Sequence, residues 1–203
     1  MTKKKQKERF EEMRQRSEEK ILAVALELFA TKGYKNTSIS DIAKKANISK
    51  GLMYNYFDGK KALLRTIIQN AINEGNNLIQ HALEDYASPI LELEHLVLDT
   101  IEHVKNNFQF WKLLTSLTHQ QYILESVADL VEAQKKWGIE KGVELFTKLK
   151  SPNPLQSAFL LGAALDGIML HYIHMGKEYP IDEMAKNLVE TFTHPHSIHL
   201  GKG

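Results

Sequence analysis

The stretch NISKGLMYNYF, residues 47–57, gathers hydroxyl, ammonium, amide and aromatic side chains that could contact nucleic acid. Ser49 precedes a short helical segment, and the unpaired N–H groups at the start of a helix form a seat for a phosphate. Lys50 adds a mobile positive charge beside that seat. Tyr54 and Tyr56 stand two positions apart, so in a helix their side chains point about 200° apart and cannot share one buried face. We therefore expect the two tyrosines to have different roles.

Contacts to phosphates fix the register and affinity of a DNA-binding protein but carry no sequence information. Specificity must come from side chains that a helix in the major groove turns towards base edges. An asparagine such as Asn55 suits an adenine edge, and a methionine such as Met53 can touch a thymine methyl group. Gly51 lets the backbone approach the duplex closely. The residues expected to read bases are Lys50, Gly51, Met53, Tyr54 and Asn55.

Two short helices are needed to place this stretch in a groove. In TSISDIAKKA, Ser38 precedes a helix and Asp41 follows three positions later, which resembles a capping box with aspartate in place of the usual glutamate or glutamine. Ser49 then caps a second short helix. Two short helices joined by a tight turn form a helix-turn-helix unit, whose second helix enters the major groove. The expected phosphate contacts of this unit are Ser38, Ser49, Lys50 and Lys60.

The charge of the chain is strongly uneven, although its formal net charge is only +1. Residues 1–65 contain 16 Lys and Arg against 8 Asp and Glu, whereas residues 66–203 contain 10 against 17. A basic part beside an acidic part indicates that one end of the chain meets a polyanion, and a merely uneven surface is the alternative. We expect the basic arm before residue 16 to be disordered until it orders on DNA; a solvated helical extension is the alternative.

Residues 17–64 resemble the DNA-binding head of the tetracycline-repressor-like (TetR) family of transcriptional regulators. The shared features are the aromatic residue after the glycine that ends the first helix, the Thr-Ser cap, the DIAKKA helix, the SKG turn into YNYF, and the lysine that opens the fourth helix. The resemblance implies a repressor released from operator DNA by a small molecule. It also implies that Tyr54 and Tyr56 flank the DNA, with Tyr56 at a phosphate, and that Leu52 and Phe57 pack in the core.

Helical periodicity and the lack of strand-like alternation predict an all-α chain of about nine helices. Three of them form the helix-turn-helix head, and the others form a helical body for ligand binding and dimerisation. We expect a basic arm and DNA-binding domain at residues 1–64, and the body at residues 65–203. After a first helix at 16–32 and the two short ones, the predicted helices cover roughly 60–86, 89–106, 108–117, 121–149, 154–175 and 181–193, with a kink possible in 121–149 at Gly138 or Gly142.

The segment LQSAFLLGAALDGIMLHYIHM is apolar nearly all round, which predicts burial on several sides. We expect the last two helices to form a homodimer interface; plain intrachain core is the alternative. A dimer would place two recognition helices about 34–36 Å apart, the spacing needed to read a near-palindromic site. Asp166 is an acid inside this apolar helix, where an unpaired charge is costly, so we expect it to pair with a tyrosine, a histidine or a backbone group.

A small, largely apolar effector could release the protein from double-stranded operator DNA if it binds one spacing of the two heads better than another. The rival function is a helix-turn-helix DNA-binding protein with a filled body and no small-molecule inducer. For each candidate pocket residue taken singly, ordinary core is the alternative role. The candidates form an apolar set with scattered polar groups: Phe110, Trp111, Leu114, His119, Tyr122, Trp137, Phe159 and His171.

Catalysis, metal binding and membrane association have weaker support in the sequence. The chain has no cysteine and no hydrolase or phosphate-binding motif, so we expect no catalytic role, cofactor or metal. His95, Asp99 and His103 recur every four residues but span about 12 Å, too far for one ion, and this face is expected to be solvated. Without a signal peptide or a run of about 18 apolar residues, we expect a cytoplasmic protein with no membrane partner.

Overall fold

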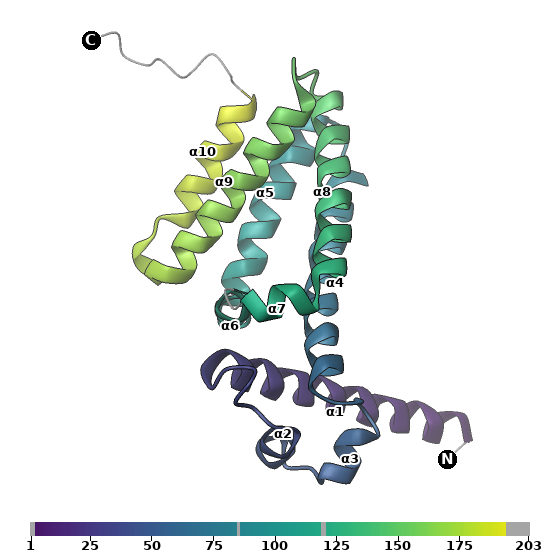
Figure 1. Ribbon diagram of the computed structural model, residues 1–203. Helices are drawn as coiled ribbons and strands as arrows, with labels where there is room; N and C mark the ends of the chain where they lie inside the picture. The colour runs from purple at the N-terminus through teal and green to yellow at the C-terminus, as the bar shows by residue number, and fades with distance from the viewer. Residues whose placement is uncertain (1–2, 85, 119–120, 194–203) are drawn as a thin grey trace. The chain divides into compact units, whose positions relative to one another are not determined.

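The computed structural model describes residues 3–84, 86–118 and 121–193, and these residues form helices joined by short turns (Figure 1). The predicted all-α fold is confirmed. Three predicted helices, at 89–106, 154–175 and 181–193, have the expected bounds. The helices are α1 Lys3–Thr31, α2 Ile39–Ala46, α3 Lys50–Tyr54, α4 Lys60–Glu84, α5 Pro89–Asn106, α6 Phe108–Thr118, α7 Gln121–Ser126, α8 Ala128–Lys148, α9 Pro154–Met175, the 3-10 turn η1 Gly176–Glu178, and α10 Ile181–Thr193.

The chain divides into two compact units. The first unit, here called the head unit, holds Met1–Ala71 and Leu113–Ala128, and the second, the body unit, holds Ile72–Lys112 and Asp129–Gly203. Helices α4 and α6 each contribute residues to both units. The domain boundary expected after residue 64 falls inside α4, and the grouping of Leu113–Ala128 with the head was not predicted.

The core of the head forms around the second half of α1. Ile21, Ala25 and Phe29 recur at helical spacing and are at most 1% exposed. The helix ends where Gly33 adopts a φ of +89°, a conformation that glycine adopts without strain. The buried Thr37 hydroxyl then donates to the carbonyl oxygen of Leu28 in the last turn of α1 and to that of Gly33 just beyond the helix, which ties the end of α1 to the following loop.

The basic arm differs from the expected disordered segment. Helix α1 begins at Lys3, so the arm continues the helix without a break, as in the alternative of a solvated helical extension. Its lysines, arginines and glutamates are good helix formers, and Arg14 pairs with Glu18 one turn later at 3.3 Å. Phe10 and Met13 are more than half exposed on this extension.

The core of the body unit forms where α5, α9 and α10 pack together (Figure 1). Its buried side chains include Leu93, Ile101, Leu161, Ile168 and Leu188. One charged residue is buried with them: Glu92, 6% exposed, accepts hydrogen bonds from the Lys148 ammonium at 2.8 and 3.0 Å. The lysine offsets the cost of burying the carboxylate, and the pair ties α5 to α8.

The segment predicted as one helix over 121–149 is two helices, α7 and α8. The break does not fall at Gly138 or Gly142, where the kink was expected. It falls at Val127, after the Ser126 hydroxyl donates to the Ile123 carbonyl oxygen at 2.8 Å and competes with the helical backbone. Gly142 instead allows close packing of α8 against α9, because a Cβ atom there would lie 2.8 Å from the Ala158 Cβ.

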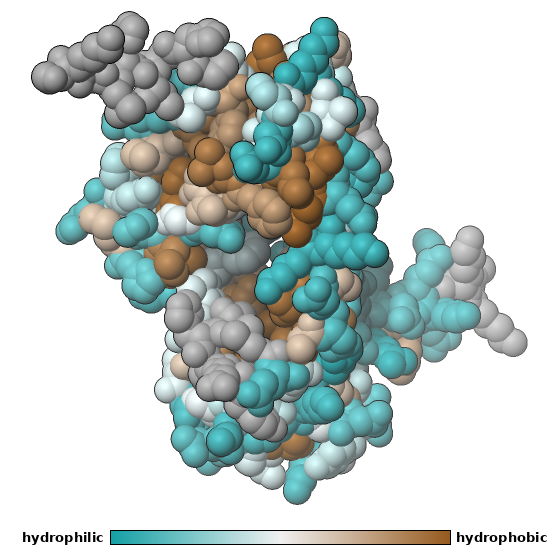
Figure 2. Space-filling model, turned by 45° about the horizontal axis from the view of Figure 1, so that its top comes forward, coloured by the Kyte–Doolittle hydropathy of each residue, from teal (hydrophilic) through white to brown (hydrophobic). Residues whose placement is uncertain are grey.

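Helix α9 leaves an apolar face uncovered. The span Pro154–Glu178 is long and apolar enough to cross a membrane by length and composition alone, and only 17% of its most apolar window is buried. Hydrophobic surface gathers in the upper part of Figure 2, on the face where α9 runs in Figure 1. The large apolar side chains that are exposed on α9 are Leu155, Phe159, Leu160, Leu170 and Met175.

Candidate DNA-binding interface

The predicted capping box of α2 is present. Ser38 Oγ accepts a hydrogen bond from the Asp41 N–H at 3.1 Å, and Asp41 Oδ2 accepts from the Ser38 N–H at 2.8 Å. Hydrogen bonds from the Ser38 side chain and backbone and from Lys32 lower the pKa of the Asp41 carboxyl. The start of α2 is therefore fixed by a carboxylate that stays ionised throughout the physiological range.

The turn between α2 and α3 is fixed at both ends. Asn47 adopts the left-handed conformation, with φ 59° and ψ 47°, and its N–H donates to the carbonyl oxygens of Ala43 and Lys44. Ser49 then caps α3, where its Oγ accepts a hydrogen bond from the Leu52 N–H at 3.0 Å. Both serine caps predicted from the sequence are thus confirmed as helix caps, and the two helices form a helix-turn-helix unit.

The face of α3 that points to solvent differs in one position from the expected set. Tyr54 is 49% exposed, and Lys50, Gly51 and Asn55 are also exposed. A Cβ atom on Gly51 would meet nothing closer than 4.0 Å, so packing within the head does not require a glycine there. The lack of a side chain at Gly51 therefore leaves room for another molecule to approach the backbone of α3 closely.

The roles expected for Leu52 and Met53 are exchanged. Met53 is 0% exposed and Leu52 is 40% exposed, so the assignment of Met53 to a thymine methyl group is wrong and so is the assignment of Leu52 to the core. Residues four apart share a helical face, whereas residues five apart do not. Met53 and Phe57 are four apart and both are buried, while Leu52 lies on the side that faces solvent.

Lys60 has a structural partner. Its ammonium donates to the carbonyl oxygen of Tyr34 at 2.8 Å and to that of Lys35 at 3.4 Å, and it lies 4.7 Å from the centroid of the Tyr34 ring. Lys60 therefore fastens the first turn of α4 to the loop that follows α1. Its proposed phosphate contact would have to compete with these bonds or share the ammonium with them.

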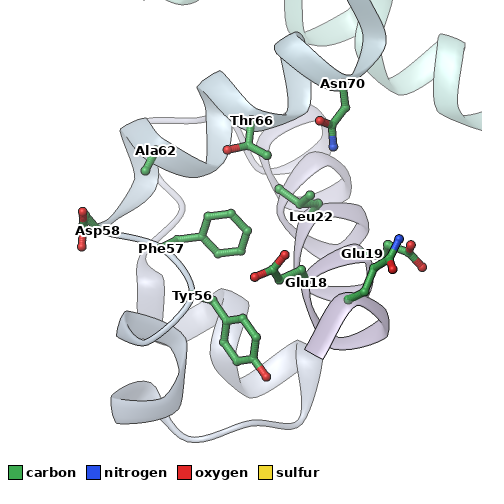
Figure 3. A pocket seen from close by; sticks show the side chains of 10 residues that line it. Glu18, Glu19, Leu22, Tyr56, Phe57, Asp58, Ala62, Thr66 and Asn70 are labelled. Carbon is green, nitrogen blue, oxygen red and sulfur yellow. The ribbon is translucent and has the colours of Figure 1, made fainter. Parts of the chain in front are cut away.

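Tyr56 is half-buried and lines a cleft of about 550 Å³ in the head unit. The cleft lies between α1, the segment after α3 and the start of α4 (Figure 3). Phe57 and Leu22 contribute apolar surface, while Glu18 and Glu19 contribute carboxylates. Tyr56 thus lines this cleft whereas Tyr54 is exposed, so the two tyrosines have different surroundings, as expected.

None of the candidate ligand residues lines either of the two clefts in the described part of the chain. The cleft in the head unit and a smaller one of about 140 Å³ between α4 and α8 are lined by other residues. Phe159 is 55% exposed, and His171 is exposed and stacks on Tyr179. Leu114 is buried in the head unit, whereas Phe110, Trp111 and Trp137 are half-buried in the body unit. His119 and the side chain of Tyr122 lie outside the described residues.

Two other expectations for the body concern His103 and Asp166, and the first of them is wrong. His103, placed by its spacing on a solvated face, is only 19% exposed and lies edge-on to Trp111. Asp166 is exposed and has no hydrogen bond or ion pair with any residue that the structure describes, so its pairing near the dimer interface stays a prediction. Burial of its carboxyl among the apolar groups of α9 raises its pKa.

The capped helix pair, the exposed polar face of α3 and the separate helical body define a helix-turn-helix DNA-binding protein. Comparison with known proteins agrees, since residues 21–67 match the model of the tetR family of bacterial regulatory proteins. The HTH-type transcriptional regulator YvkB of Bacillus subtilis (strain 168) is 24% identical over 165 residues, which cover 77% of this chain and 83% of that protein.

Two further comparisons concern the head and the fold. The negative transcriptional regulator IcaR of the biofilm operon icaADBC in Staphylococcus aureus (strain Newman) is 39% identical over 61 residues, 30% of this chain and 33% of that protein. The structure of AibR in complex with isovaleryl coenzyme A and operator DNA matches with a TM-score of 0.67 at 21% identity, over 87% of this chain and 98% of that one. Residues 21–67 therefore form a DNA-binding head of the TetR type, and the chain is a DNA-binding transcriptional regulator.

Proposed function

We propose that the chain represses transcription as a homodimer whose two α3 helices read a near-palindromic operator. The observation that carries this proposal is the exposed face of α3, where Lys50, Gly51, Tyr54 and Asn55 project from a helix held by buried Met53. Asparagine at this face suits an adenine edge, and lysine suits guanine O6 and N7. The exposed Leu52 takes the place of Met53 as the candidate for contact with a thymine methyl group.

Contacts to the DNA backbone would come from residues on either side of this face. Ser38 and Ser49 stand at the starts of α2 and α3, where free N–H groups favour a phosphate. The Tyr56 hydroxyl and the Lys60 ammonium complete the proposed set. Because such contacts are electrostatic or unspecific, they would set the salt dependence of binding and not the base preference.

Homodimerisation through α9 and α10 has support in the uncovered face of α9. Phe159, Leu160 and Leu170 are between 38% and 59% exposed, which is unusual for large apolar side chains on one helix. Gly162 and Gly167 have no atoms of other residues within 4 Å of an added Cβ atom, so a second helix can approach closely there. A symmetric dimer also matches the two-fold symmetry of a palindromic operator.

Release by a small molecule has support in two helices that belong to both units. Helix α4 continues from the head unit into the body unit, and α6 continues from the body unit into the head unit. A molecule that binds the body and moves either helix would change the free energy of one head arrangement relative to another. The related structure of AibR was solved with both an acyl coenzyme A and operator DNA, and the related IcaR is a negative regulator.

The rival function, DNA binding without an inducer, also has an observation in its favour. The cleft between α4 and α8 has a volume of about 140 Å³, which is smaller than the roughly 300 Å³ typical of ligand pockets. In either case the protein would act in the cytoplasm, where bacterial operator DNA lies, and its role would be regulatory and not catalytic. A screen of metabolites separates the two functions. A metabolite that raises the melting temperature of the protein and also weakens operator binding would support release by a ligand.

Selection of bound DNA from a random pool tests the proposed interface. We expect a near-palindromic site, and Asn55→Ala should relax the preference at one position per half-site at a cost of about 1–3 kcal/mol. Lys50→Ala should lower the salt slope of binding, whereas Lys177→Ala, in the 3-10 turn of the body unit, is the matched control for charge and should not. Unchanged preference in the Asn55 variant and unchanged slope in the Lys50 variant would refute this docking.

Sedimentation tests the dimer. Phe159→Glu should shift the protein to monomers and weaken operator binding, because two charges would be buried at the interface. Ile90→Glu is the matched control, since Ile90 on α5 is also 49% exposed but lies outside α9 and α10. A Phe159→Glu protein that sediments as the unaltered protein does would place the contact elsewhere.

A further inference from the structure

Four buried polar atoms among the described residues have no hydrogen-bond partner, and all four belong to the body unit. They are Asn76 Oδ1 on α4, His103 Nε2 on α5, Trp111 Nε1 on α6 and Gln134 Oε1 on α8. Folded proteins leave few buried polar groups unpaired, and such a group calls for an explanation such as a bound water, ion or ligand. The described residues of the head unit contribute none of the four.

Two of these four atoms lie in one aromatic cluster. The rings of His103 and Trp111 meet edge to face, with centroids 5.9 Å apart and planes at 78°. The Trp111 ring also meets the Phe110 ring at 5.6 Å and 85°. The unpaired ring nitrogen of Trp111 is therefore set against aromatic rings, where an unpaired polar group is costly, and the unpaired Nε2 of His103 belongs to the same cluster.

Both nitrogens are donors. An indole N–H can only donate a hydrogen bond. For His103, the contact with Asn107 favours one tautomer: Asn107 Nδ2 donates to the His103 carbonyl oxygen at 3.0 Å, and the same amide nitrogen lies 3.5 Å from His103 Nδ1, where its second hydrogen suits an acceptor. Nδ1 is then the acceptor, so Nε2 carries the hydrogen. The cluster thus presents two N–H groups that lack an acceptor.

A carboxylate lies beside His103 in the cluster. Glu74 Oε2 lies 3.7 Å from His103 Nε2, too far for a hydrogen bond but close enough to repel a second carboxylate. Lys105, on the last turn of α5, is held by Asp182 at 2.7 and 2.9 Å. The missing acceptor is therefore better supplied by an uncharged oxygen than by an anion.

From these contacts we infer that the body takes a small, uncharged aromatic or apolar molecule that accepts hydrogen bonds from Trp111 and His103 through one oxygen, such as a carbonyl. This inference rests on the proposed ligand response and gives the effector a polar group that the expected, largely apolar ligand lacks. Because Trp111 Nε1 is covered, the molecule must displace neighbouring side chains to enter. Trp111 lies on α6, whose second half belongs to the head unit, so entry acts on a helix shared by both units.

Three probes of similar size test the inference: acetophenone, which has a carbonyl acceptor, ethylbenzene, which has none, and benzoate, which is an anion. The chain has only two tryptophans, so its nitrogen–proton NMR spectrum holds two indole signals, and the Trp137→Phe variant identifies that of Trp111. Acetophenone should move the Trp111 signal downfield and bind about 25-fold more tightly than ethylbenzene, as expected for two net hydrogen bonds of about 1 kcal/mol each. Benzoate should bind more weakly than acetophenone.

Matched variants complete the test. Trp111→Phe and His103→Phe keep a ring but remove an N–H, so each should weaken acetophenone binding about fivefold and leave ethylbenzene binding unchanged. His95→Phe makes the same change elsewhere on α5 and should alter neither affinity. If a variant fails to fold, the signal shift in the unaltered protein still decides the outcome.

The outcomes separate this inference from the proposed function. Equal binding of acetophenone and ethylbenzene, tighter binding of benzoate, or an unmoved Trp111 signal overturns the inference, since a buried water alone would then satisfy the two donors. Operator affinity is measured separately with and without acetophenone. Binding as expected with unchanged operator affinity supports this site but counts against release by a ligand there, whereas release by another molecule without acetophenone binding supports the proposed function alone.

Discussion

The exchange of Leu52 and Met53 gives a direct test of how α3 is oriented. Met53 is fully buried, so Met53→Ala removes a whole side chain from the head core and leaves a cavity. Such truncations cost about 2–5 kcal/mol. Leu52 is 40% exposed, and Leu52→Ala should change the free energy of unfolding by less than about 1 kcal/mol. The order of the effects on operator affinity should be the reverse, with the larger loss for Leu52→Ala, because only Leu52 is placed to contact the duplex.

The chain has two units, so one overall unfolding free energy is not defined for it. Native-state hydrogen exchange of the amides in α1, α2 and α3 measures the stability of the head itself. Operator affinity is then compared at a temperature at which the heads of both variants remain folded. A head that Leu52→Ala destabilises more than Met53→Ala does would refute this orientation, as would a stable Met53→Ala protein with an altered preference at a thymine.

Three other changes have defined outcomes. Asp41→Ala should lower head stability at pH 7, and the difference from the unaltered protein should shrink in urea titrations below about pH 4, because the lowered pKa means that the stabilising charge is lost as pH falls. Asp166→Asn should raise body stability at pH 7, where burial disfavours the ionised carboxyl, and the gain should vanish below about pH 4; a constant difference would exclude this cause. Removal of residues 2–9 should weaken operator binding and flatten its salt slope, and an unchanged slope would reject a DNA role for the arm.

Sequence patterns predicted the body helices best where caps and prolines mark the ends. Helix α5 begins at Pro89 after the Ser88 cap, and α9 begins at Pro154 after the Asn153 cap. These signals act locally, so they can be read without knowledge of the fold. The helix-turn-helix unit was predicted for the same reason, since its two serine caps lie within a few residues of the helices that they start.

The errors arose where long-range packing decides the structure. A helix as short as α3 has too few residues for periodicity alone to choose its buried face, and contact with the head core selects Met53. The burial of His103, and of Glu92 with its partner Lys148 on α8, likewise depends on residues that are distant in sequence. The helical arm was not predicted for a different reason. Its many basic residues suggest contact with DNA, but the same residues are also good helix formers.

Helices α4, α6 and α8 all cross the boundary between the units, α8 by its first residue alone, and this limits how the head and the body could be recombined with those of related regulators. A chimera cut after residue 64 would divide α4 within its second turn and would separate the head from Leu113–Ala128, which groups with it. The buried Leu117, Ile123 and Val127 of that segment would then have to match a head with which they did not evolve. Exchange of bodies should therefore succeed more often when the transplanted head carries its own Leu113–Ala128 segment. Such a chimera needs three junctions, one in α4, one in α6 and one at the start of α8, and not a single cut.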